Sequence, residues 1–211
     1  PSCAEVYLDT ISDSASPEKS ITIVFDTTMS GGCLCSSWDN KYRRGIIKAT
    51  WTGMYRDPGT VITITTHNYY VNDNKFDYTK TVTNNGPNGA GHLTYDIDVS
   101  VANIDFTDGT SMTWTSHRTR EWVEGQGTLT PLDDVYSITG TAEGTNRHGV
   151  HFTANITNAL VFAVGCQFIK QGTIEITPDG AAVRTLDFGN GACDSQATVE
   201  INGVVFNINL Q

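Results

Sequence analysis

The chain has 211 residues, of which 17% are charged, and its formal net charge is −10 at neutral pH. This acidic balance excludes a nucleic-acid partner, because phosphate binding needs clustered Lys and Arg and the one basic cluster, residues 41–44, is short. No run approaches the roughly 20 apolar residues that cross a bilayer, so we expect no membrane span.

In chain order, residues 1–20 mix short apolar and polar stretches, and we expect an N-terminal arm or a short helix there. The first strand is predicted at Ile21–Phe25, followed by a loop over residues 29–43. From Gly45 onward, apolar and polar residues alternate with period two, which is typical of half-buried strands. The clearest alternations cover residues 47–52, 93–101 and 150–157.

Turn signals separate these strands along most of the chain. Asn-Gly and Asp-Gly pairs tolerate the positive φ values of two-residue hairpin turns. They occur at residues 85–86, 88–89, 108–109, 179–180, 190–191 and 202–203. The sequence therefore predicts an all-β fold, an antiparallel meander of about twelve to fourteen strands forming a sandwich or an open barrel. Residues 21–211 are predicted to form a single domain.

Five cysteines in an acidic, threonine-rich β protein indicate an oxidising compartment. Cys166 and Cys193 are the first predicted pair, because each follows a strand in the last third of the chain. Cys3 is expected to pair with either Cys33 or Cys35, and one thiol is left over. Because the chain begins with Pro1 rather than Met, we also expect a mature form whose leader has been removed.

No residue cluster specifies a reaction. Asp133 and Asp134, with Glu121 and Glu124, flank a loop as an acid and a base would, but neighbouring residues on a strand point to opposite faces. Solvated turn carboxylates are the favoured interpretation, and no catalytic residue is assigned. No metal or cofactor is expected; calcium is an alternative at two Asx-rich turns, residues 72–77 and 187–194.

Aromatic residues are the strongest indication of a binding surface, although aromatic residues that alternate with threonine are also typical of a core. Adjacent residues on a strand cannot both face inward, so Tyr69 and Tyr70 are candidates for an exposed glycan-binding surface, together with Trp122.

Several segments resemble a group of secreted or lipid-anchored β-rich proteins of Bacteroidota. The segments are residues 44–48, 82–86, 115–122, 136–141 and 186–194. This resemblance implies export to the cell surface and brings no catalytic residues with it. Two Asp-Ser/Thr-apolar triplets also look like the O-glycosylation acceptor of that phylum, which makes Thr10 and Ser14 candidate sites.

Three functions compete. The first is a non-catalytic extracellular subunit that self-associates into an oligomer or fibre through strand edges, using the apolar C-terminal strand. Its predicted contact residues are Val204, Phe206, Ile208 and Leu210. The alternative is a glycan-binding surface protein. An exported hydrolase ranks third.

Overall fold

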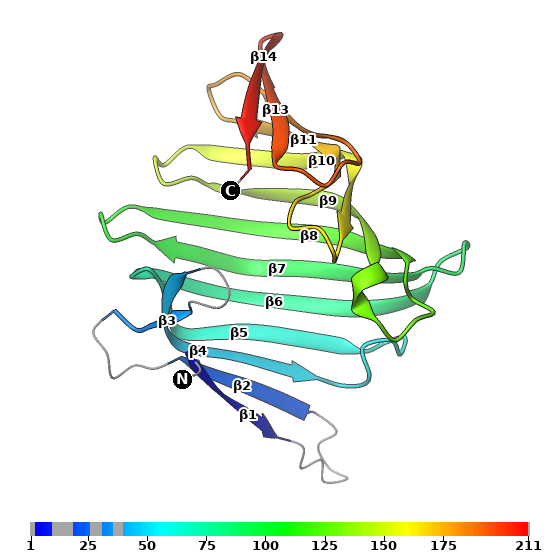
Figure 1. The fold of residues 1–211 in the computed structure, drawn as a ribbon. Coiled ribbons are helices and arrows are strands. Elements are labelled where there is room, and N and C mark those ends of the chain that lie inside the picture. The colour runs from blue at the N-terminus through cyan, green and yellow to red at the C-terminus, as the bar shows by residue number, and fades with distance from the viewer. Residues whose placement is uncertain (1–2, 10–18, 26–30, 36–39, 211) are drawn as a thin grey trace.

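The computed structural model describes residues 3–9, 19–25, 31–35 and 40–210, and these residues form one antiparallel sheet (Figure 1). Its strands are β1 (Ala4–Asp9), β2 (Lys19–Phe25), β3 (Cys33–Cys35), β4 (Lys41–Trp51), β5 (Val61–Val71), β6 (Asn74–Pro87), β7 (Leu93–Asp105), β8 (Ser111–Glu124), β9 (Val135–Thr145), β10 (His151–Ala163), β11 (Gln171–Pro178), β12 (Arg184–Asn190), β13 (Gln196–Ile201) and β14 (Val204–Asn209). A short 3-10 helix, η1 (Pro131–Asp133), lies between β8 and β9.

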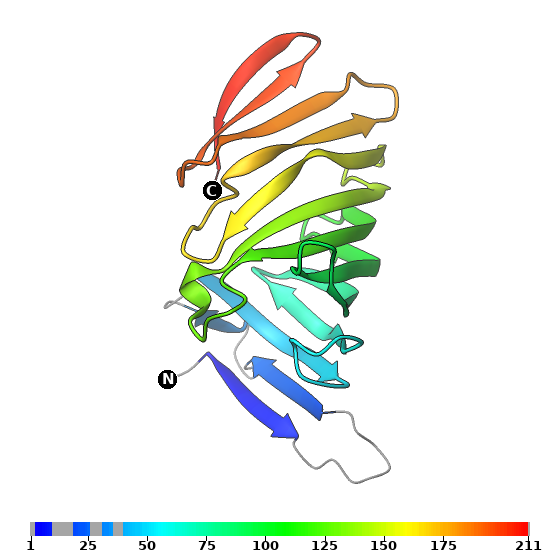
Figure 2. The same ribbon diagram turned by 90° about the vertical axis from the view of Figure 1, so that its right-hand side faces the viewer.

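The predicted antiparallel meander is confirmed. Strands adjacent in the chain are neighbours in the sheet, except that β2 pairs with β4 while β3 pairs with the beginning of β4. Among the described residues, β1 and β14 have no strand partner on their outer sides, so the sheet forms part of a ring with two open edges (Figure 2). The predicted alternative of a sandwich is wrong, because the strands bend as one twisted sheet and do not split into two layers.

Residues 4–9 correct the expectation for the N-terminus. We predicted an arm or a short helix, but this segment is β1, paired with β2 from Ala4 opposite Phe25 to Asp9 opposite Ser20. Alternation of Val6 and Leu8 with polar neighbours fits a strand at the edge of the sheet. No helix long and apolar enough to traverse a bilayer occurs in the described part of the chain.

Because apolar and polar residues alternate along each strand, residues of one kind line up in rows across the whole sheet. One row of directly paired residues has one member on each strand of the main path, and it is mostly apolar. The row is Leu8, Ile21, Ala49, Ile64, Lys80, Val99, Ser116, Ala142, Ala154, Ile176, Arg184, Ile201 and Val204. We call this side the inner face.

The neighbouring row lies on the opposite side, the outer face, and is polar in every strand but the last. It consists of Asp9, Ser20, Thr50, Thr63, Thr81, Asp98, His117, Thr141, Asn155, Glu175, Thr185, Glu200 and Val205. The abundance of threonine in the sequence is therefore a property of this solvated face.

Two apolar clusters form the core, both on the inner face. The first cluster contains Val82, Tyr95, Trp122 and Tyr136, with Tyr55 packed against it. The loops before β5 and before β9 close over it, and η1 lies in front of the sheet in Figure 1. The second cluster contains Phe25, Cys33 and Tyr69 and is joined by Cys3 and Cys35. The second cluster therefore attaches the N-terminal strands to the rest of the sheet.

Candidate functional site

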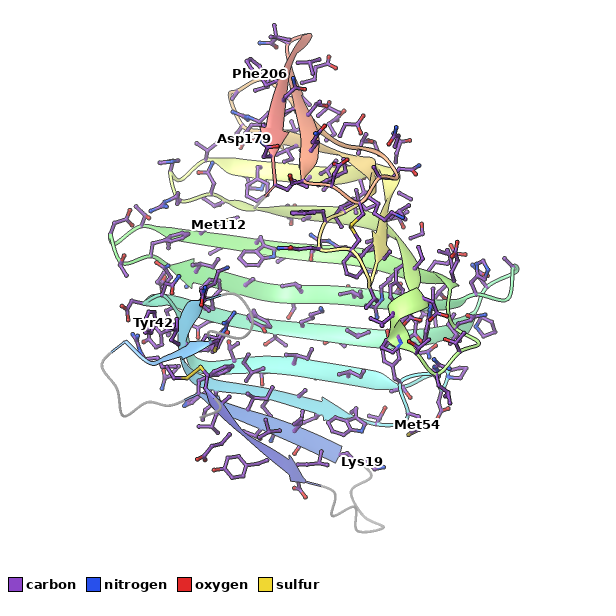
Figure 3. The ribbon with its side chains drawn as sticks, viewed as in Figure 1. Lys19, Tyr42, Met54, Met112, Asp179 and Phe206 are labelled. Carbon is purple, nitrogen blue, oxygen red and sulfur yellow. A yellow bond between two sulfur atoms is a disulfide. The ribbon has the colours of Figure 1, made fainter. Side chains whose placement is uncertain are left out.

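The C-terminal edge strand β14 exposes apolar side chains on both faces. Val204, Val205 and Phe206 are 50–57% exposed, and Phe206 projects from the end of the sheet in Figure 3. Of the four predicted contact residues, Val204 and Phe206 are therefore exposed, while Ile208 and Leu210 are half-buried. Leu210 follows the strand and its N–H donates to the carbonyl of Ser195. The strand carries neither a charge nor a proline, the residues that protect an edge from further pairing.

The opposite edge, β1, has the same length and a similar exposure, which the sequence did not lead us to expect. Val6, Tyr7 and Leu8 are 55–60% exposed. Val6 and Leu8 share one face of the strand, and Leu8 begins the apolar row of the inner face that Val204 ends. Both open edges thus continue the same apolar face. The alternation of apolar and polar residues over residues 4–9 is a sequence signal that could have predicted this edge strand.

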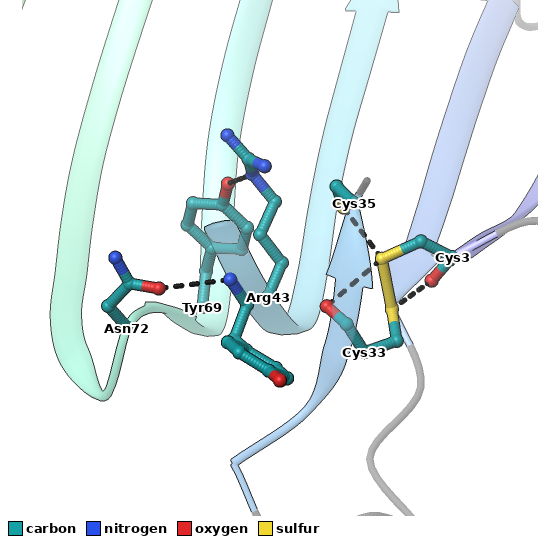
Figure 4. Close-up of a disulfide and its surroundings, with 7 residues drawn as sticks. Cys3, Cys33, Cys35, Arg43, Tyr69 and Asn72 are labelled. Carbon is teal, nitrogen blue, oxygen red and sulfur yellow. Dashed lines mark hydrogen bonds between the residues drawn. A yellow bond between two sulfur atoms is a disulfide. The ribbon is translucent and has the colours of Figure 1, made fainter. Parts of the chain in front are cut away.

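Two disulfides hold segments that lie at the ends of strands. Cys166 and Cys193 are bonded as predicted, joining the chain after β10 to the chain after β12. Cys3 is bonded to Cys33, one of the two partners left open, and Cys35 is the free cysteine (Figure 4). Two disulfides indicate that the protein belongs to an oxidising compartment.

The predicted aromatic platform is wrong for two of its three residues. Tyr69 and Trp122 are only 6% and 3% exposed, because both point into the clusters of the inner face. Tyr70 does turn to the other side of its strand, but the guanidinium of Arg44 covers its ring at 3.9 Å from the centroid. The sequence alone does not show which strands neighbour one another. Aromatic residues that alternate with threonine therefore fit both an exposed binding surface and a buried core.

A cationic side chain occupies the centre of the first cluster. The Cζ atom of Arg120 lies 4.8 Å from the ring centroid of Tyr136 and 5.2 Å from that of Tyr95. Burial raises the pKa of both phenols far above its usual range, so both rings stay neutral. Asp134 is buried beside them and accepts a hydrogen bond from the Tyr136 hydroxyl.

Two other carboxylates considered for catalysis, those of Asp133 and Glu121, serve local structure. Asp133 accepts a hydrogen bond from the Thr128 hydroxyl. The Glu121 carboxylate contacts the amide of Asn88 and lies 2.7 Å from Nδ1 of His92, and these contacts lower the pKa of Glu121. These contacts brace the loop between β6 and β7 against β8.

The two Asx-rich turns also use their oxygens internally. Asn72 and Asp73 adopt positive φ values of 47° and 63° and form the hairpin turn between β5 and β6. Asp73 pairs with Arg44. In the second turn, Asp187 and Asp194 accept hydrogen bonds from backbone N–H groups two residues further on. Among described residues, the one group of three close potential ligand atoms consists of the sulfurs of Cys3, Cys33 and Cys35, and two of these are bonded to each other in the disulfide.

Thr10 and Ser14, the candidate O-glycosylation sites, lie outside the described residues. Comparison with known proteins gives no relative: no family model matches the chain, and neither does any curated protein or solved structure. The resemblance to surface proteins of Bacteroidota therefore stays a prediction. The candidate site is the pair of open sheet edges.

Proposed function

We propose that the protein is a non-catalytic extracellular subunit that associates with further copies of itself through the two edges of its sheet. The observation that carries this proposal is the matched exposure of β1 and β14, each six residues long. Both edges expose apolar side chains, although β1 also carries Glu5 and Asp9, and neither edge has a further strand partner among the described residues.

The pairing that fits the two edges is β14 of one copy against β1 of the next. Such a contact joins the mostly apolar inner row and the mostly polar outer row of one copy to the same rows of the next, because each row has a member on both β1 and β14. A contact between two different surfaces is heterologous, and it produces an open chain of subunits unless its rotation closes a ring. The product is a fibre with one continuous sheet.

The amount of exposed surface supports association. The accessible surface is 12,414 Å², whereas a compact monomer of 22.9 kDa is expected to expose about 9,600 Å². A single sheet without a covering layer contributes to this excess. Covering the edges with a second copy buries apolar side chains that the monomer leaves in water.

The two disulfides support an extracellular location, and the resemblance to exported surface proteins agrees with it. A non-catalytic role is supported by the carboxylates, whose oxygens brace loops and turns. The subunit thus offers surfaces and carries no proposed reaction.

Two edge variants test the pairing. Val6→Lys places a charge on β1 and Phe206→Lys places one on β14, while Leu129→Lys changes a fully exposed loop residue as the control. We expect the native chain and the control to grow in size with concentration in analytical ultracentrifugation and to form fibres in negative-stain micrographs. Each edge variant alone stays monomeric.

Mixing the two edge variants gives the sharpest outcome. Each has one intact edge, so the mixture forms dimers that contain one copy of each variant and cannot grow further. A native chain that stays monomeric at all concentrations contradicts the proposal. Dimers of Val6→Lys alone contradict the head-to-tail arrangement and indicate pairing of β14 with β14.

A further inference from the structure

Three sulfur atoms gather where the N-terminal strand meets β3. Cys33 and Cys35 are two residues apart on β3, so both side chains point to the same face and toward Cys3 (Figure 4). Cys3 is bonded to Cys33, and the Sγ atom of Cys35 lies 2.6 Å from the Sγ atom of Cys3. All three sulfurs lie within 4.8 Å of one another.

We propose that Cys35 exchanges with the disulfide, so that Cys3 is bonded alternately to Cys33 and to Cys35. The Cys35 thiol loses its proton to water, and the thiolate attacks the Sγ atom of Cys3. The bond between Cys3 and Cys35 forms as the bond between Cys3 and Cys33 breaks. Cys33 leaves as a thiolate and takes up a proton. One disulfide is replaced by another, so no oxidant or reductant is needed.

The exchange changes which thiol faces solvent. Cys35 lines an open cavity of about 630 Å³ on the inner face, whose other walls are mostly apolar. Cys33 is only 7% exposed and lies in the second core cluster. When Cys3 is bonded to Cys33, the cavity presents a thiol. When Cys3 is bonded to Cys35, the free thiol is buried and the cavity presents a disulfide.

The N-terminal edge stays attached in both states. Cys3 immediately precedes β1, and both of its partners lie on β3. The exchange therefore controls the reactivity of the cavity without releasing the edge strand, and it does not depend on the proposed self-association. The free cysteine, Cys35, lies beside Cys3 and Cys33. The disulfide between Cys166 and Cys193 has no free cysteine beside it among the described residues and therefore serves as an internal reference that should not exchange.

Thiol mapping of the native protein tests the exchange. The oxidised chain is denatured in acid, which stops exchange, alkylated with N-ethylmaleimide at low pH, digested and mapped by mass spectrometry. We expect one label per chain, divided between Cys33 and Cys35, and no label on Cys166 or Cys193. Label on Cys35 alone overturns the proposal.

Single-residue variants give a second measurement. In Cys33→Ser, we expect Cys3 to be bonded to Cys35 and no thiol to take up label. In Cys35→Ser, the disulfide between Cys3 and Cys33 remains. Cys3→Ser is the matched control, in which Cys33 and Cys35 both take up label because neighbours two apart on a strand are poorly placed to bond. Two labelled thiols in Cys33→Ser contradict the exchange.

Discussion

Arg56 lies over the indole of Trp122, with its Cζ atom 4.6 Å from the ring centroid. Its two terminal nitrogens donate to the carbonyls of Gln126 and Thr128, each at 3.0 Å. One guanidinium thus joins the loop before β5 to the loop after β8 and covers the first core cluster between them.

We expect Arg56→Ala to lower the free energy of unfolding by about 1–2 kcal/mol, through the loss of the ring contact and of two hydrogen bonds. Arg56→Lys should lose less, because an ammonium keeps the charge over the ring but does not reach both carbonyls in the same fork. Urea unfolding followed by tryptophan fluorescence measures both. Native stability in Arg56→Ala would contradict this role.

Gly45 allows β4 and β5 to approach closely. Its φ is +96°, and a Cβ atom placed there would lie 1.9 Å from the carbonyl oxygen of Asn68. We expect Gly45→Ala to destabilise the fold by about 3 kcal/mol or more, since both the backbone and the neighbouring strand must shift. Gly127→Ala is the control, because no atom lies within 4 Å of its Cβ position. Thermal unfolding of the two variants should differ clearly; equal midpoints would refute the close approach.

Lys80 interrupts the apolar row of the inner face, between Ile64 and Val99. Burial lowers the pKa of Lys80, and the charges of Arg120 and Arg118 lower it further. The unfolded chain therefore binds the ammonium proton of Lys80 more tightly than the folded chain does. The resulting loss of folding stability is fully present at neutral pH. It disappears as the pH rises from the folded pKa through the unfolded one.

We expect Lys80→Met to raise the free energy of unfolding at neutral pH by about 1 kcal/mol. The reason is that burial disfavours the charged ammonium, whereas it favours the apolar side chain that replaces it. Lys48→Met changes an exposed lysine of the outer face and should have little effect. Thermal unfolding at pH 7 compares the two. A lower midpoint for Lys80→Met would show that the ammonium stabilises the sheet.

His117 and Asp98 are directly opposite each other on the outer face, with Nδ1 2.6 Å from the carboxylate. The hydrogen bond and charge of Asp98 raise the pKa of His117. This pair stabilises the fold fully below the unfolded histidine pKa of about 6.5, and the contribution is lost as the pH rises through the raised folded value. Since both side chains are exposed, it amounts to about 0.3 kcal/mol.

An NMR titration measures the effect directly. In Asp98→Asn, the pKa of His117 should fall toward that of a free histidine. Asp105→Asn removes a carboxylate elsewhere on β7 and should leave the titration of His117 as it is in the native chain. No change in Asp98→Asn would mean that the pair does not form in solution.

Local signals account for the parts of the fold that were predicted. Asn202 and Gly203 have φ values of 51° and 78° and form the turn between β13 and β14, as their types indicate. The same reasoning misplaced Asn85 and Gly86, which lie inside β6 beside an irregularity in its pairing with β7. Asn72 and Asp73 were considered as calcium ligands, yet they form the turn between β5 and β6.

The amino-acid sequence by itself determined the antiparallel strands, most of their turns and the pairing of Cys166 with Cys193. The strands and turns depend on residues close together in the chain, through period-two alternation and the φ values that asparagine and glycine tolerate, and the disulfide follows from the placement of both cysteines after strands. Only the tertiary structure decided that Tyr69 and Trp122 are buried, that one curved sheet replaces a sandwich, and that β1 forms an edge. Those outcomes depend on packing between distant segments, such as Arg56 on Trp122, which no local pattern encodes.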